Sequence, residues 1–257
     1  MTLRHQDQST QAELAEPRVD LQRVGLQQSA VRNIPAQRSD RIQATYRLLA
    51  VAVFCAMASA WWASRTLPVI QFLVTGPGLI LSLVAINAVP AIALRMLGSG
   101  SKTGTIVLAL DGLLSGVALS PLVYVALRVS GYGEEAPNLV QAALLVTATA
   151  FLGVTAYVHK SGANFNWGRG LFSGLFFSAL GLLAVAFFFP VSGAFTYLLL
   201  GIVGVLGVVQ LLYGTSKVLN DPEFNDPISG ALILFAGIFN LFQVVLSLLL
   251  SGGRSRN

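Results

Sequence analysis

The sequence predicts an all-α integral membrane protein, a bundle of seven transmembrane helices. Hydrophobic residues make up 54% of the 257-residue chain and charged residues only 11%, against roughly a quarter in soluble domains. Several apolar segments approach or exceed the length of about 20 residues with which a helix crosses a bilayer. Lys and Arg flank these segments and give a net charge of +5. This pattern is typical of oriented membrane helices rather than of nucleic-acid binding.

Seven spans are predicted, and all are helical because an isolated strand leaves its backbone polar groups unsatisfied in lipid. A basic residue follows each of the first four, and Pro190 ends the fifth. The start of the second is left open between Ile70 and Gly78. Two Asp-Pro steps predict turns between the sixth and seventh. In chain order, the spans are residues 45–64, 78–93, 104–127, 139–158, 170–189, 194–213 and 228–250.

The ends of the chain differ from this membrane domain, which we place at residues 44–251. The first 40 residues hold five arginines and five acids among polar residues, a composition that is typical of disorder. No apolar segment follows closely enough for a signal peptide. We therefore expect residues 1–43 to form a disordered cytoplasmic tail, with a short helix near residues 19–28 left open, and residues 252–257 to form a short C-terminal tail.

The distribution of Lys and Arg predicts the orientation. Twelve of the 16 fall on the side of the N-terminal tail, and four fall on the other: Arg65, Arg128, Arg254 and Arg256. The positive-inside rule then places the N-terminus in the cytoplasm and, with seven spans, the C-terminus outside. We expect a multi-pass protein of the cell (inner) membrane.

The sequence offers little for an enzyme. The single cysteine, Cys55, excludes a disulfide framework. With one cysteine and two histidines, the chain also argues against a metal site. Residues 98–104, "GSGSKTG", lack the spacing of a phosphate-binding loop. The common hydrolase and metalloprotease motifs are absent. We expect no enzymatic activity, no cofactor and no nucleic-acid partner.

Asp111 is an acid inside the third predicted span. Placing a charge at the bilayer centre costs about 2.5–3.5 kcal/mol on insertion scales. Three interpretations stay open: a cation or proton site, a neutral carboxyl that hydrogen-bonds a neighbouring helix, or a carboxylate near enough to the interface to contact water. Ser115, four residues on, shares its helical face and is a candidate partner.

Asn240 and Gln243 lie three residues apart on one face of the last span. They are candidates to line a polar pathway through the bundle for an ion or proton. The alternative is hydrogen bonding between helices, which contributes on the order of 0.6 kcal/mol for each bond.

Several stretches, taken in their order and spacing, resemble one family. They are "SGVALSPL" (115–122), "TAYVHKSGANFNWGRGLFSGL" (155–175), "LLYGTSKVLND" (211–221) and "LFAGIFNLFQVVLSLL" (234–249). Together they look like the Bax inhibitor-1 family, the transmembrane Bax inhibitor motif proteins. "GPGLILSLV" (76–84) and "TSK" (215–217) resemble a bacterial branch whose best-known member modulates the membrane-anchored FtsH protease.

The resemblance implies six helices around a central last helix. It also implies, for many members, a pH-sensitive calcium leak that is latched by paired carboxylates in the sixth and seventh helices. Those two positions fall on Gly214 and Gly237 in this chain. A glycine has no titratable proton, so the latch cannot be carried over.

These expectations lead to one functional hypothesis and two alternatives. The first is a non-enzymatic modulator of membrane-protein quality control, whose partner is a membrane-anchored AAA protease of the FtsH type and whose tail is the contact. The alternative is a pH-sensitive calcium or proton leak that uses Asp111 in place of the missing pair. A small-solute transporter is less favoured because the helices show no obvious inverted repeat.

Overall fold

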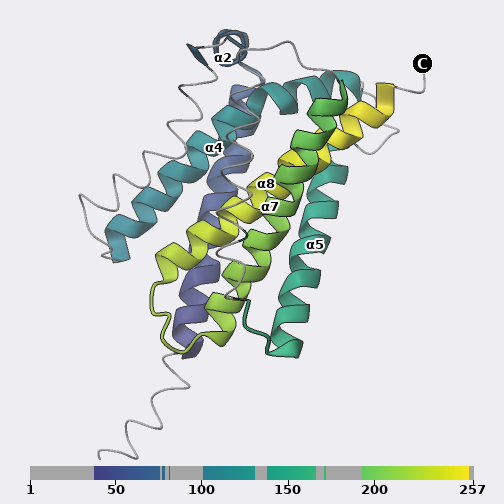
Figure 1. Ribbon diagram of the computed structural model, residues 1–257. Helices are drawn as coiled ribbons and strands as arrows, with labels where there is room; N and C mark the ends of the chain where they lie inside the picture. Colours follow the sequence, from purple (N-terminus) through teal and green to yellow (C-terminus); the bar gives the residue numbers. More distant parts are fainter. Residues whose placement is uncertain are drawn as a thin grey trace, which may run out of the picture. The chain divides into compact units, whose positions relative to one another are not determined.

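The structure is a computed structural model that describes residues 38–75, 77–78, 81, 101–130, 138–165, 171 and 193–254. These residues are helical apart from short connections, and none of them forms a strand (Figure 1). The N-terminal helix spans Arg38–Ala63. After it come α2 (Leu67–Leu73), α4 (Ser101–Val129), α5 (Leu139–Ser161), α7 (Gly193–Asn220) and α8 (Pro227–Arg254).

The described part contains five helices that are long and apolar enough to cross a membrane. They are the N-terminal helix, α4, α5, α7 and α8, and they coincide with the first, third, fourth, sixth and seventh predicted spans. The prediction of an all-helical membrane protein is therefore confirmed, and the chain is a multi-pass one. Nearly all of the predicted spans at residues 78–93 and 170–189 lies outside the described residues, as do residues 1–37 of the predicted tail.

The described helices extend beyond the predicted spans at several ends. The N-terminal helix begins at Arg38, inside the segment that we predicted as tail, and α7 continues to Asn220 rather than ending at Tyr213. Hydropathy marks the part of a helix that lies in lipid, but a helix continues as long as its backbone bonds do. Contacts between Cα atoms divide the chain into Met1–Gln43 and Ala44–Asn257. The packing below concerns the second unit.

Local side-chain chemistry fixes several helix ends. Asn138 caps α5 by accepting a hydrogen bond from the backbone N–H of Val140 at 2.9 Å. Gly162 ends that helix with φ of +61°, a left-handed conformation that glycine adopts without steric cost. Asp226 caps α8 by accepting from the N–H groups of Ile228 (3.1 Å) and Ser229 (3.2 Å). These caps satisfy N–H groups that the first turn of a helix leaves unpaired.

Contacts between named residues give the helix directions. Gly112 and Gly116 of α4 lie against the carbonyls of Ala52 and Ala56, so α4 runs parallel to the N-terminal helix. Gly104, near the start of α4, lies against Ile228, near the start of α8. These two helices therefore begin at the same end of the bundle, which we call the loop end because the α7–α8 connection lies there.

The helices α7 and α8 form an antiparallel pair joined by residues 221–226 (Figure 1). The segment after α5 is hydrogen-bonded to Ser216 and Asn220, close to the end of α7. Both α5 and α7 therefore end at the loop end. The helix α8 packs against α4, α5 and α7. Its Phe242 and Leu246 lie in a buried cluster with Ala60, Val123 and Ala143 at the opposite end.

Large apolar side chains cover the outside of these helices. Phe54 is 69% exposed and Leu145 70% exposed, which suits a surface that faces hydrocarbon. Basic residues at the ends of helices stack on aromatic rings. The Arg65 guanidinium lies 4.0 Å from the centre of the Trp61 ring, and that of Arg128 lies 5.2 Å from the Tyr124 ring. Such aromatic and basic residues are typical of a membrane–water interface.

Candidate functional site

Asp111 lies inside the helical packing rather than on its outer surface. The residue is 7% exposed, and Ser115, one turn later, is 1% exposed. Both lie on the buried face of α4 with Leu108 and Leu119. Within the described part of the chain, no hydrogen bond or ion pair reaches the carboxyl group. Asp111 therefore faces protein, and its carboxyl group has no polar partner among the described residues.

A close approach of two helix backbones lies beside Asp111. A Cβ atom on Gly112 would lie 2.4 Å from the carbonyl oxygen of Ala52, and one on Gly116 would lie 2.1 Å from that of Ala56. The hydroxyl of Ser59 lies at the same spot and donates to the carbonyl of Ala56 at 3.2 Å. Sequence reasoning missed this contact, although the pattern Gly112-x-x-x-Gly116 is a known signal for close helix approach.

The two positions of the missing acids lie buried between α7 and α8. A Cβ on Gly214 would lie 2.8 Å from Cγ2 of Ile233, and one on Gly237 would lie 2.9 Å from Cγ and Cδ2 of Leu211. Aliphatic side chains thus occupy the space that a carboxylate would need at either place. The interface therefore has no titratable group at these two positions, and aliphatic side chains pack closely around both glycines.

Asn240 lies in the same interface and is joined to the opposite helix. Its Nδ2 donates a hydrogen bond of 2.7 Å to Oε1 of Gln210. Next to this bond, α7 and α8 approach closely, because a Cβ on Gly207 would lie 3.1 Å from the carbonyl oxygen of Gly237. Of the two interpretations of Asn240, the structure therefore supports an interhelical hydrogen bond.

Gln243 is not part of this contact. Its residue is exposed, and its backbone carbonyl accepts from Ser247 within α8. Among the described residues, no hydrogen bond joins Asp111 or Ser115 to Asn240 or Gln243. The predicted ion or proton site is thus not assembled from these four residues by direct contact.

We expect the amide pair to stabilise the contact between α7 and α8 modestly. In a double-mutant cycle with Gln210→Ala and Asn240→Ala, the coupling free energy should be about 0.6 kcal/mol and at most about 1.7, as for other hydrogen bonds between membrane helices. Unfolding of the four proteins in detergent measures it. A coupling energy of zero would mean that the two amides do not interact in the folded protein.

A polar clamp at the loop end joins α5 to α7. The hydroxyl of Ser216 accepts from the N–H of Phe165 at 3.0 Å and donates to the carbonyl of Ala163 at 3.1 Å. Nδ2 of Asn220 donates to the same carbonyl at 2.9 Å. Two of the stretches that resemble the family, residues 155–175 and 211–221, therefore meet here. Because the two stretches lie far apart in the sequence, the sequence analysis did not predict this contact.

One ion pair lies beside the clamp. Lys217 and Asp221 are one turn apart at the end of α7. The hydrogen bond from the Lys217 ammonium lowers the pKa of the Asp221 carboxyl, and bonds from the N–H groups of Glu223 and Phe224 act in the same direction. Asp221 thus stays ionised and holds the start of the α7–α8 connection. No group of three or more metal-ligating side chains occurs in the part of the chain that the structure describes.

Comparison with known proteins gives two findings. The family model described as "Inhibitor of apoptosis-promoting Bax1" matches residues 38–255. Over 146 residues, the chain is 30% identical to the uncharacterized protein PA2604 of Pseudomonas aeruginosa. That match covers 56% of this chain and 63% of the relative, so it spans less than two thirds of the relative's length.

Proposed function

Because the chain belongs to the Bax inhibitor-1 family, we propose that it is a non-enzymatic, seven-span protein of the bacterial inner membrane that acts by contacting a protein partner. Its role is to modulate membrane-protein quality control. The observation that carries this proposal is the closed interface between α7 and α8. Gly214 and Gly237 stand where the family resemblance places paired acids, and Ile233 and Leu211 occupy the adjoining space.

The closed interface favours a partner role over a gated pore. A carboxylate pair works as a latch because two close acids cannot both ionise at low cost, so that protonation changes their contact. The amides of Gln210 and Asn240 do not titrate, and they join the two helices directly. An interface of amides, glycines and aliphatic side chains offers no titratable group that could act as a proton switch.

Helix directions support seven spans. The N-terminal helix and α4 run parallel, yet the first ends at Ala63 and the second begins at Ser101. Likewise α5 and α7 both end at the loop end, and the 28 residues of α7 make it about 42 Å long. The seven-span proposal, which counts one crossing in each interval, agrees with these helix directions. The packing of α8 against α4, α5 and α7 is consistent with a central last helix.

The placement of charged residues supports a cytoplasmic N-terminus. Lys102, Lys160 and Lys217 lie at helix ends that meet at the loop end, whereas Arg65 and Arg128 follow or end helices at the opposite end. The positive-inside rule places the loop end in the cytoplasm. With seven spans, the C-terminus then lies outside.

The proposed partner is a membrane-anchored AAA protease of the FtsH type, and the proposed contact is the tail before Arg38. This assignment rests on the resemblance of residues 76–84 and 215–217 to the protease-modulating branch. A polar, charged segment suits contact with a protein in the cytoplasm, because its side chains offer charges and hydrogen-bonding groups to a partner.

Replacement of residues 2–37 by a Gly/Ser segment of equal length tests the partner role. The half-life of a protease-dependent membrane substrate should shift when the full-length protein is overproduced and should stay unshifted with the replacement. Equal membrane levels of both proteins are the control. An equal shift with both proteins would remove the tail as the contact, and no shift with either would remove the protease as the partner.

Asp111 favours a second candidate function. An ionisable residue inside a span is a functional candidate by default, and Asp111 is almost fully covered yet has no polar partner among the described residues. The second candidate is a slow calcium or proton leak in which this carboxyl replaces the missing pair. Flux into proteoliposomes should then be present in the wild type and lost in Asp111→Asn at both acidic and neutral pH. Absence of flux in the wild type rules this candidate out.

A further inference from the structure

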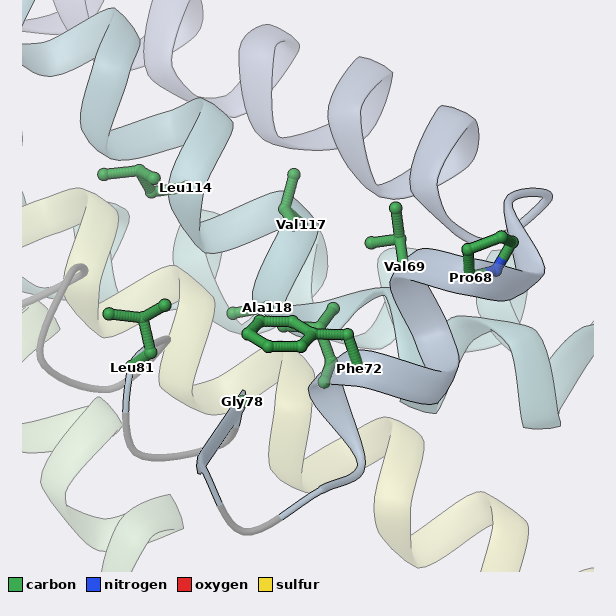
Figure 2. Close-up of a pocket in the computed structure, with 9 residues that line it drawn as sticks. Pro68, Val69, Phe72, Gly78, Leu81, Leu114, Val117 and Ala118 are labelled. Atoms are coloured by element: carbon green, nitrogen blue, oxygen red, sulfur yellow. The ribbon is translucent and has the colours of Figure 1, made fainter.

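An apolar groove lies between α2 and α4, outside the interfaces described above. Its volume is about 410 Å³, within the range of pockets that bind small ligands. Figure 2 shows Val69 and Phe72 of α2 facing Leu114, Val117 and Ala118 of α4 across this space. Pro68, Leu73, Gly78 and Leu81 complete the described lining.

The lining limits what the groove can bind. All nine residues are aliphatic, aromatic, proline or glycine, so their side chains offer no hydrogen-bond donor or acceptor. A polar ligand would leave its own groups unpaired, at a cost of several kcal/mol in an apolar site. A hydrocarbon chain has no polar group that would be left unpaired in the groove. The hydrocarbon that surrounds a multi-pass membrane protein is the acyl chains of the bilayer lipids.

A basic residue lies just before the N-terminal end of α2. Arg65 is exposed, occupies the turn between the N-terminal helix and α2, and precedes the groove residue Pro68 by three positions. Its guanidinium carbon lies 4.0 Å from the centre of the Trp61 ring, a cation–π contact that needs no N–H donor. Guanidinium edges bind phosphate through two parallel, charge-assisted hydrogen bonds. The adjacent Trp62 is also exposed, as is typical of side chains at the headgroup level.

We propose that the groove between α2 and α4 is a phospholipid site, in which one acyl chain lies along Phe72 and Val117 and Arg65 holds the phosphate. The single cation and the lack of a nearby acid in this turn favour an anionic phospholipid over a zwitterionic one. The site does not involve the α7–α8 interface, so it goes beyond the proposed function and does not depend on it.

Filling the groove tests the acyl-chain part. Val117→Phe adds a ring inside the groove, and Val125→Phe adds the same ring two turns later on α4, where the side chain is 40% exposed and outside the lining. Native mass spectrometry of the full-length proteins, with phosphatidylglycerol added in detergent, measures bound lipid. Val117→Phe should weaken binding at least about tenfold, and Val125→Phe should leave it unchanged. Thermal unfolding of both variants shows whether each stays folded.

The charge is tested separately. Arg65→Gln should weaken phosphatidylglycerol binding by about tenfold and the weaker binding of phosphatidylethanolamine by less, because the ammonium of the latter already offsets the phosphate charge. Binding that is equal in wild type and a folded Val117→Phe protein would overturn the groove as the site. Equal binding of the two lipids to the wild type would overturn the preference for an anionic lipid, and equal binding of phosphatidylglycerol to the wild type and Arg65→Gln would overturn Arg65 as the headgroup contact.

Discussion

Replacing Gly116 with leucine should prevent the N-terminal helix from packing on α4. Any Cβ at this position would lie 2.1 Å both from the backbone oxygen of Ala56 and from the Ser59 hydroxyl. A backbone oxygen cannot move unless its helix moves. We therefore expect a loss of stability above the 1–3 kcal/mol or so that ordinary overpacking costs. Unfolding in detergent, followed by size-exclusion chromatography, measures it.

Gly153→Leu is the matched control for this substitution. Gly153 lies in the middle of α5, and no described atom lies within 4 Å of its Cβ position. Leucine there should change stability by no more than about 1 kcal/mol, the difference in helix propensity between glycine and leucine. A Gly116→Leu protein as stable as Gly153→Leu would show that the parallel crossing at Gly112 and Gly116 does not exist.

Gly237→Asp should destabilise the protein much more than Gly237→Ala. Both substitutions press a Cβ against Leu211 and the carbonyl of Gly207, at 2.9 and 3.1 Å. The leucine side chain can yield, so alanine should cost about 1–3 kcal/mol. Aspartate adds an acid to a closed apolar contact, which should cost about 2.5–3.5 kcal/mol more on membrane-insertion scales.

The difference between these two variants is the informative quantity, because the contact of the Cβ atom is common to both and the remainder comes from the carboxyl group. Unfolding of the two proteins at neutral pH in the same detergent gives it directly. If aspartate and alanine destabilise the protein equally, water reaches Gly237, and the interface between α7 and α8 is open rather than closed.

The sequence predicted the membrane helices well but not their ends. Mean hydropathy found all five described spans because burial in lipid imposes one composition on every span. The N-terminal helix and α7 extend further because polar helical turns lie outside the lipid and carry no hydropathy signal. The prediction that Gly214 and Gly237 hold no latch depended on the family resemblance, which marks the two positions, and on the identity of the residues there. The structure adds that Ile233 and Leu211 fill the space.

The contacts between distant residues were beyond prediction. The clamp of Ser216 and Asn220 on Ala163 joins residues more than 50 positions apart, and a single sequence contains no signal for such a pairing. Asn240 and Gln243 share a helical face in sequence terms, yet Asn240 binds Gln210 and Gln243 is exposed. Helical periodicity gives relative angles around one helix, but neighbouring helices decide which side is covered.

Calcium flux into proteoliposomes at acidic and neutral pH tests the account most directly. A relative of this family that retains both acids serves as the positive control in liposomes of the same composition. Because the interface between α7 and α8 is closed and has no titratable group at Gly214 and Gly237, we expect the wild-type protein to give no flux above empty liposomes at either pH. A calcium flux that changes with pH, as in the control, would contradict the account.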